Sequence, residues 1–528
     1  MSRRAFQRLG VVLAMVVAAA PAGSGASAPM TKTRIAQGEL RGLEKGEVTA
    51  FLGVPFAAPP TGERRWQPPR PPQTWAGIRQ ADHFGPSCEQ TVTPGGFGPW
   101  TAEYVVSGDV SEDCLFLNIW TPASSSRAKL PVLVWIHGGA FTSGSGSVPI
   151  YDGTGLGAKG IVVVTINYRV GVYGFLAHPQ LTAESPAHAS GNYGLLDQVE
   201  ALRWIHANIG AFGGDPTRVT IAGQSAGAAA VHHLIATPLA KGLFHRAIAQ
   251  SGSGMGLAVP DRVVAEESGT RLAQAAGVRG IAELRALSPQ QISDALKKMP
   301  ADAGAIGFGP IVDGLLLPDA KTVGANTNDT PILTGMTAHE MVGLNPNVGK
   351  TTPGTLRAEI EKAYGASASD VLALYPAADD AAAKAAAEAL ARDRGLASTY
   401  LWARQRETVT RQPIYLYLWT HTEPGPDAAR YKAFHSSEIP YVFETLGAAP
   451  RPFADEDYDL AVLMSSYWAN WTKKGDPNGD DLPRWPQFGK TMLILEIGSP
   501  THARPILGDA ARAAFEKYVQ SGGKIGLF

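Results

Sequence analysis

The sequence has few cysteines, almost no net charge and, beyond its first residues, no long apolar run. Its 528 residues include 2 Cys, and 46 Lys and Arg balance 47 Asp and Glu to a net charge of -1. That balance provides no positive surface for a nucleic-acid backbone and argues against binding to an anionic membrane surface. No later segment is apolar for long enough to span a bilayer. A content of 45% hydrophobic and 18% charged residues is typical of globular proteins and excludes general disorder.

The first residues have the pattern of an export signal. Ser2-Arg3-Arg4 precedes an apolar run over Leu9–Ala20, and Ala26-Ser27-Ala28 fits a cleavage site. We therefore predict a signal peptide over residues 1–28 and an exported protein, periplasmic or secreted. The paired arginines resemble a twin-arginine signal, and an ordinary Sec signal is the alternative. We expect residues 29–528 to form a single domain, because no linker is long enough to divide them.

The two cysteines, Cys88 and Cys114, stand in neither a metal-ligand spacing nor a C-x-x-C spacing. In an exported protein an even pair most often forms a disulfide, which we predict here. Two free, buried thiols are the alternative.

Strand and helix patterns alternate along the chain. Continuous apolar runs rich in β-branched residues are typical of strands buried on both faces of a parallel sheet. We predict such strands at Pro131–Ile136, Ile161–Ile166, Val219–Ala222, Pro331–Thr334 and Ile414–Trp419. Helical patterns lie between them, and we predict helices at Leu195–Ile209 and Asp379–Ala397. The alternation predicts an α/β fold with right-handed crossovers.

A candidate nucleophile lies at one strand-to-helix turn. Gly223-Gln224-Ser225-Ala226-Gly227 matches G-x-S-x-G, with a predicted strand before it and a predicted helix from Ala226 to about Ile235 after it. This is the context of a nucleophile elbow, in which a strained turn projects the serine hydroxyl above the sheet. We therefore predict that Ser225 is a nucleophile. A serine hydroxyl is a poor nucleophile unless a base removes its proton, so a base must lie nearby.

A glycine-rich segment can supply the donors that such a nucleophile needs. His137-Gly138-Gly139-Ala140-Phe141 follows a predicted strand, and its glycines allow backbone N–H groups to approach a substrate oxygen. We predict an oxyanion hole from the N–H groups of Gly138, Gly139 and Ala226. His137 is expected to anchor this loop rather than to act as the base. In folds built around such an elbow the catalytic histidine follows the serine in the chain, whereas His137 precedes Ser225.

Several separated segments occur in the order found in one enzyme family. They are Gly53–Phe56, Arg65–Pro69, Glu112–Ile119, Gly191–Gln198, Phe212–Gly227 and Gly475–Asn478. Over essentially the whole mature chain, the sequence resembles the type-B carboxylesterase/lipase family, the cholinesterase-like branch of the α/β-hydrolases. The resemblance implies an α/β-hydrolase fold, with a mostly parallel central sheet flanked by helices and helical insertions over the active site, roughly within 254–428. It also implies that Cys114 is disulfide-bonded.

The resemblance assigns the remaining catalytic residues. Lys432–Glu438 matches the family segment that carries the base, which implies His435; His421, at the end of the preceding strand, is the competing histidine. Gly335–Met341 matches the segment of the triad acid, which implies Glu340.

Three positions depart from the family pattern. His339 and Met341 flank the implied acid where the family has Asp and Gly, and Gln224 stands where a Glu is common. We expect Gln224 to alter local hydrogen bonding without loss of chemistry. Asp313 is expected to be a structural turn residue.

The implied activity is serine-dependent hydrolysis of a carboxylic ester through an acyl-enzyme, with no metal or organic cofactor. The expected substrate is a small-molecule or lipid-like ester. Cleavage of amides or carbamates, acyl transfer, and an inactive binding member of the superfamily are the alternatives. Four apolar residues are candidates for the substrate pocket or, equally, for core packing: Phe141, Leu257, Phe308 and Phe434.

Overall fold

The computed structural model describes residues 28–255, 259–299, 308–319, 327–345, 347 and 349–527. The predicted signal peptide at 1–28 lies outside these residues except for its last position. Among the described residues, no helix combines the length and the apolar character needed to cross a membrane.

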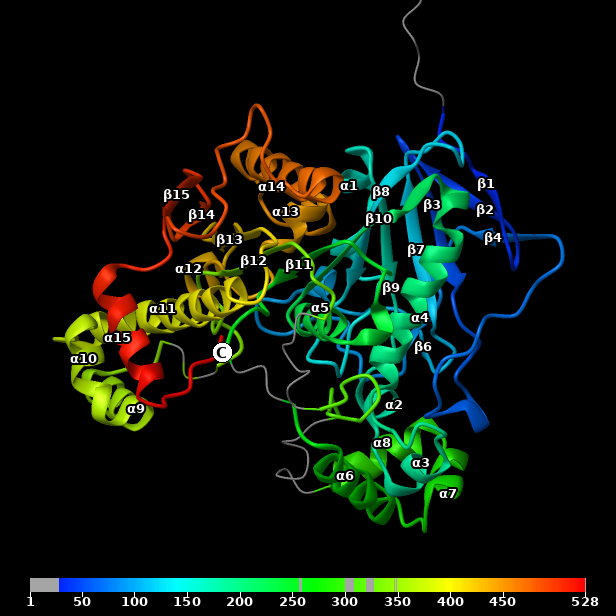
Figure 1. Cartoon of the computed structure of the whole chain (residues 1–528), viewed down its shortest axis with the longest axis horizontal. Coiled ribbons are helices and arrows are strands. Elements are labelled where there is room, and N and C mark those ends of the chain that lie inside the picture. Colours follow the sequence, from blue (N-terminus) through cyan, green and yellow to red (C-terminus); the bar gives the residue numbers. More distant parts are fainter. Residues whose placement is uncertain are drawn as a thin grey trace, which may run out of the picture.

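Within the described residues, the molecule is built on one 13-stranded sheet (Figure 1). The strands follow the order β1-β2-β3-β7-β9-β8-β10-β11-β12-β13-β14-β15, with β4 paired to β2. Their bounds are β1 Lys32–Ile35, β2 Gly38–Lys45, β3 Val48–Pro55, β4 Ile78–Ala81, β7 Phe116–Thr121, β8 Leu130–Ile136, β9 Val162–Ile166, β10 Gly214–Gln224, β11 Arg246–Gln250, β12 Ile332–Thr337, β13 Ile414–Trp419, β14 Leu493–Ile497 and β15 His502–Pro505. A small second sheet joins β5 (Ser87–Cys88) to β6 (Val110–Ser111).

The centre of the large sheet is parallel, from β9 through β8 and β10 to β14. Each predicted strand lies in this region, and β13 has the predicted bounds. Strands β9, β12 and β13 are buried along their whole length, and β8 is buried apart from its first residue, because helices cover both faces. The outer strands β1, β2, β3, β7 and β15 pair antiparallel with their neighbours, apart from the parallel β2–β4 pair. The predicted fold class, a mostly parallel α/β-hydrolase sheet, is confirmed.

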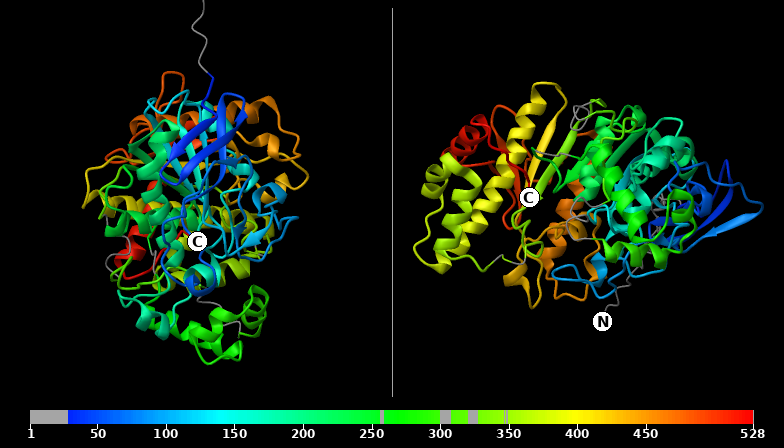
Figure 2. Two further views of the ribbon diagram at one scale, coloured as in Figure 1. Left: turned by 90° about the vertical axis from the view of Figure 1, so that its right-hand side faces the viewer. Right: turned by 90° about the horizontal axis from the view of Figure 1, so that it is seen from below.

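Helices pack on both faces of the sheet. Their bounds are α1 Thr154–Ala158, α2 Gly171–Phe175, α3 Pro179–Glu184, α4 Tyr193–Asn208, α5 Ala226–Ala236, α6 Arg262–Ala275, α7 Ile281–Ala286, α8 Pro289–Lys298, α9 Pro353–Tyr364, α10 Ala368–Leu374, α11 Asp380–Glu407, α12 Ala428–Tyr431, α13 Ile439–Phe443, α14 Asp455–Lys474 and α15 Asp509–Gln520. The helices α9, α10, α11 and α15 form one end of the molecule, and β1, β2 and β4 lie at the other end (Figures 1 and 2).

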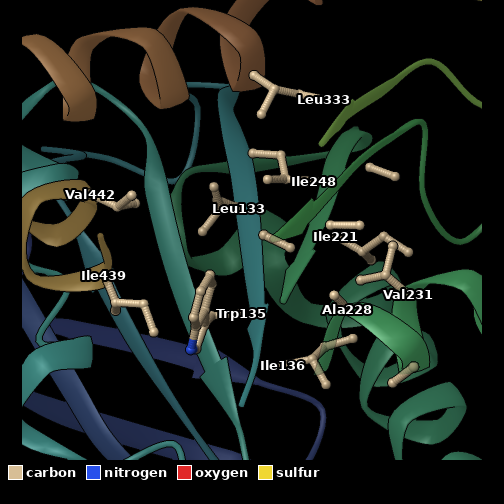
Figure 3. Packing of buried hydrophobic residues seen from close by; sticks show 14 of the residues in the cluster. Leu133, Trp135, Ile136, Ile221, Ala228, Val231, Ile248, Leu333, Ile439 and Val442 are labelled. Atoms are coloured by element: carbon tan, nitrogen blue, oxygen red, sulfur yellow. The ribbon is translucent and has the colours of Figure 1, made fainter. Parts of the chain in front are cut away.

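Side chains of β8 alternate between the two faces, as a strand requires. Leu133 and Trp135 face α13, where Val442 lies, whereas Ile136 faces α5 (Figure 3). Trp135 also packs edge-on against Phe443, with ring centroids 5.0 Å apart. This two-sided packing holds the carboxyl ends of β8 and β10 in fixed register, since Ile136 pairs with the last glycine before the elbow.

Cys88 and Cys114 are joined by a disulfide, so the predicted pairing is confirmed. The bridge closes a segment between β5 and β7 that contributes to the cavity described below.

Candidate active site

Ser225 occupies a strained turn between β10 and α5. Its backbone dihedral angles are φ 58° and ψ -124°, an unfavourable region for a residue with a Cβ. The turn is held from outside, because the Ser225 N–H donates to the Gln250 carbonyl of β11 over 2.9 Å. The predicted strand–turn–helix context of the serine is therefore present.

The two glycines that flank the turn allow very close packing. A Cβ at Gly223 would lie 2.5 Å from the backbone of Gly227, and a Cβ at Gly227 would lie 2.0 Å from the Ile136 carbonyl oxygen of β8. Real Cβ atoms do not approach backbone this closely, so the elbow requires glycine at both positions. The same packing presses α5 onto the end of β8 and sets the height of Ser225 above the sheet.

His435 and Glu340 are brought together from separate loops. Glu340 follows β12 and His435 follows α12, and the loops are joined where the His339 N–H donates to the Ala433 carbonyl over 3.1 Å. His435 Nδ1 donates a hydrogen bond to Glu340 Oε2. Both side chains are buried, which makes this charge-assisted contact stronger than it would be in water.

Two further donors fix the carboxylate of Glu340. Its Oε1 accepts from the Thr337 backbone N–H over 2.8 Å and from Ser251 Oγ over 2.5 Å. These donors fix the orientation of the carboxylate beside His435. Burial disfavours the imidazolium of His435, but the charges of Glu340 and Glu438 outweigh burial and raise the pKa of His435 above its ordinary value.

A second buried carboxyl, Glu438, lies near this pair. Burial, together with the Glu340 charge, raises the pKa of Glu438 to about 7. Its Oε1 accepts from Gln250 Nε2 over 2.9 Å, and Gln250 Oε1 accepts from Trp468 Nε1 over 3.0 Å. Gln250 thus binds the backbone of Ser225 and the side chain of Glu438 at once, and it couples the elbow to the loop of His435.

The loop after β8 lies against the elbow. A Cβ at Gly138 would lie 2.8 Å from the Gln224 carbonyl and 3.2 Å from the Cβ of Ser225, so glycine permits this approach. Among the described residues, none accepts a hydrogen bond from the N–H of Gly138, Gly139 or Ala226. Three backbone donors beside Ser225 are thus available to an oxyanion.

His137 anchors this loop and takes no place in the cavity wall. Its ring stacks on Tyr168 with centroids 4.2 Å apart, and its Nδ1 donates to the Gly138 carbonyl over 2.9 Å. Burial lowers the pKa of His137 to about 4, so the ring is neutral.

A cavity of about 450 Å³ joins these groups. Gly138, Gly139, Ser225 and His435 line it, together with Gln224. Half of its remaining wall residues come from the disulfide-closed segment: Gln90, Thr91, Val92, Thr93, Phe97, Trp100, Tyr104, Val105 and Val106. From the expected covering segment 254–428, Leu344 is the one described residue in the wall.

Other candidate residues lie outside this wall. His421 Nε2 forms a hydrogen bond with Asp457 over 2.7 Å, so this histidine is paired away from the cavity that Ser225 lines. Asp313 accepts from the N–H groups of residues 315–317, as a turn residue does. Phe141 packs on Phe175, Phe434 packs on Trp100 and Tyr104, and Phe308 packs against the core, while Leu257 lies outside the described residues.

Sequence reasoning overlooked the residues that hold Ser225 and Glu340 in place. Ser251 directly follows β11 and Thr337 ends β12, so both lie at the carboxyl edge where Ser225 lies. Their position at that edge was a signal, because the active sites of such sheets gather there. Gln250 carried no signal in its own sequence context.

Comparison with known proteins identifies the family of this chain. Residues 28–512 match the model of the carboxylesterase family. The chain is 37% identical to the fumonisin B1 esterase of Sphingopyxis macrogoltabida, over 93% of this chain and 90% of that protein. It is 34% identical to the human cocaine esterase, over 93% and 91%. The crystal structure of a Geobacillus stearothermophilus carboxylesterase superposes with a TM-score of 0.76 at 34% identity, covering 92% of this chain and 100% of that one. The chain therefore belongs to the carboxylesterase family and is a serine hydrolase of carboxylic esters.

Proposed function

We propose that Ser225, His435 and Glu340 are the nucleophile, base and acid of this ester hydrolysis. The observation that carries the proposal is the hydrogen bond from His435 to Glu340 at the wall of the cavity that Ser225 also lines. The strained elbow supports the role of Ser225. The hydrogen bonds that Glu340 accepts from Thr337 and Ser251 support a carboxylate that is fixed in place and holds one tautomer of the imidazole.

The chemical steps follow from these roles. His435 Nε2 removes the hydroxyl proton of Ser225 as its oxygen attacks the ester carbonyl. The N–H groups of Gly138, Gly139 and Ala226 stabilise the resulting oxyanion. His435 then protonates the departing alcohol, which leaves an acyl-serine. A water molecule gives a proton to His435 and attacks this acyl group. The bond between the acyl carbon and Ser225 Oγ then breaks, His435 returns the proton to Oγ, and the acid is released.

A fluorophosphonate probe tests the nucleophile directly. Wild-type protein should be labelled at one serine, and Ser225→Ala should lose both labelling and ester hydrolysis. Ser143→Ala is the matched control, because Ser143 lines the same cavity on the oxyanion loop and should leave labelling in place. Labelling of Ser225→Ala at the wild-type rate would refute the assignment.

We further propose that the substrate is a neutral ester with apolar groups. The described residues of the cavity wall include no Lys, Arg, Asp or Glu, and His435 is the one histidine among them. The side chains of Val92, Trp100, Tyr104 and Ile439 supply apolar surface. A buried charge without a partner would be costly in such a wall, which disfavours an anionic acyl group. A cavity of this size suits a small molecule or one chain of a lipid-like ester.

We propose that residues 29–528 act as a single catalytic unit of an exported protein. One hydrophobic core with members from Ile35 to Leu527 supports the single unit. The disulfide and the leader pattern at 1–28 support export, because disulfides persist in oxidising compartments. Changing both Arg3 and Arg4 to Lys, followed by cell fractionation, tests the twin-arginine route; unchanged export would favour a Sec signal.

A further inference from the structure

Gln224 makes an unusual contact with the imidazole of His435. It is the last residue of β10, it directly precedes Ser225, and its side chain is buried. Gln224 Nε2 lies 3.0 Å from His435 Nε2 and 3.5 Å from His435 Nδ1. A donor placed on the in-plane lone pair of Nε2 at this distance would stand about 5 Å from Nδ1, because the two lone pairs diverge. The amide therefore lies over the face of the ring.

This position leaves the ring plane to other partners. Glu340 occupies the Nδ1 edge, and the in-plane lone pair of Nε2 stays directed away from the Gln224 amide. Trp100 Nε1 donates to the His435 carbonyl over 3.0 Å and fixes the backbone of His435. The imidazole is thus held at its edge, at its backbone and on one face.

The other end of the Gln224 amide faces the oxyanion loop. A Cβ at Gly138 would lie 3.1 Å from Gln224 Oε1, so the amide lies between the imidazole and the loop whose N–H groups would bind the oxyanion. The charged groups that face His435 are Glu340, from the loop after β12, and Glu438, from the start of α13. The side chain that faces it from β10 is neutral.

We propose that Gln224 is a positioning residue, whose neutral amide packs on the face of His435, leaves the in-plane lone pair of Nε2 to Ser225, and keeps negative charge out of the space between base and oxyanion. A Glu, which is common at this position in the family, would instead add a negative charge beside the imidazole and stabilise the imidazolium. This inference rests on the proposed roles of Ser225 and His435.

Gln224→Glu and Gln224→Met separate charge from shape. The assay is the second-order rate of inactivation by a fluorophosphonate, measured from pH 5 to pH 9 and with no ester substrate. We expect Gln224→Glu to move the midpoint of the acidic limb upward by about one unit or more, since an added negative charge at this range raises the pKa of a histidine. Gln224→Met keeps the length but removes the amide, so it should lower the plateau rate about tenfold and leave the midpoint within about 0.3 unit.

Gln274→Glu is the matched charge control, because Gln274 is exposed on α6 and does not line the cavity. It should give the wild-type profile. A wild-type midpoint in Gln224→Glu would overturn the proposal. A wild-type plateau rate in Gln224→Met would also overturn it, and this second test applies even if the glutamate variant does not fold. Loss of labelling at Ser225 in the wild-type protein would instead refute the proposed triad, so the two failures are distinguishable.

Discussion

Replacing Glu340 with glutamine tests the proposed triad, because the change exchanges one oxygen for an NH₂ group at almost constant volume. The wild-type carboxylate accepts from three donors: His435 Nδ1–H on Oε2, and the Thr337 N–H and the Ser251 hydroxyl on Oε1. A glutamine amide has one oxygen and cannot accept on both sides. One of these donors must therefore face an NH₂ group.

The structure decides which side loses its acceptor. The Thr337 N–H is fixed in the backbone and buried, and an NH₂ group against it would cost about 1–3 kcal/mol. The amide oxygen is therefore expected at the Oε1 position, which turns the NH₂ group toward His435. Nδ1 must then accept, and its proton moves to Nε2. With a proton on Nε2, the imidazole cannot take the proton of Ser225.

The expected cost in kcat is about 10³- to 10⁴-fold, the size of the effect when a serine hydrolase has the wrong histidine tautomer. This factor corresponds to about 4–5 kcal/mol in the activation barrier. The assay is steady-state hydrolysis of 4-nitrophenyl acetate, with a thermal melt to establish that the variant is folded. Ser251→Ala is the matched control: it removes one donor but keeps the charge, and it should lower kcat by about tenfold or less. A kcat of Glu340→Gln within tenfold of wild type would refute the tautomer argument.

Three further results are expected. Replacing Cys88 and Cys114 together with Ala should lower the free energy of unfolding by about 3 kcal/mol in urea titrations and reduce kcat/KM, because the bridge restrains the segment that forms much of the cavity wall. Gly227→Ala should destabilise the protein by about 1–3 kcal/mol or more, because its Cβ would meet the β8 backbone at 2.0 Å, whereas Gly210→Ala, with no atom within 4 Å, should melt like wild type. An anionic ester, 4-nitrophenyl hydrogen succinate, should have a kcat/KM at least about tenfold below that of 4-nitrophenyl butyrate, because the described wall residues include no Lys or Arg to pair with its carboxylate. Equal values would contradict the proposed preference for neutral esters.

The sequence alone determined the elements that depend on local pattern. Apolar runs predicted the parallel strands, and the glycines around Ser225 predicted the elbow, because each signal lies within a few residues and reports a backbone preference. The pattern was weaker where packing overrides propensity. Helix α11 continues to Glu407, ten residues beyond the predicted end at Ala397, since Tyr400 and Ala403 bury themselves in the core. Strand β2 has a polar sequence and gave no signal of its own.

Only the tertiary structure decided which distant groups share one site. The contact between Glu340 and His435 spans 95 residues, and the contact between Gln224 and His435 spans 211. Family resemblance indicated the first contact, but no local pattern in the chain encodes the second. The cavity wall likewise takes far more residues from the disulfide-closed segment than from the later insertions. Such features depend on how loops at the carboxyl edge of the sheet converge, which burial and strand order fix and which residue type and spacing do not.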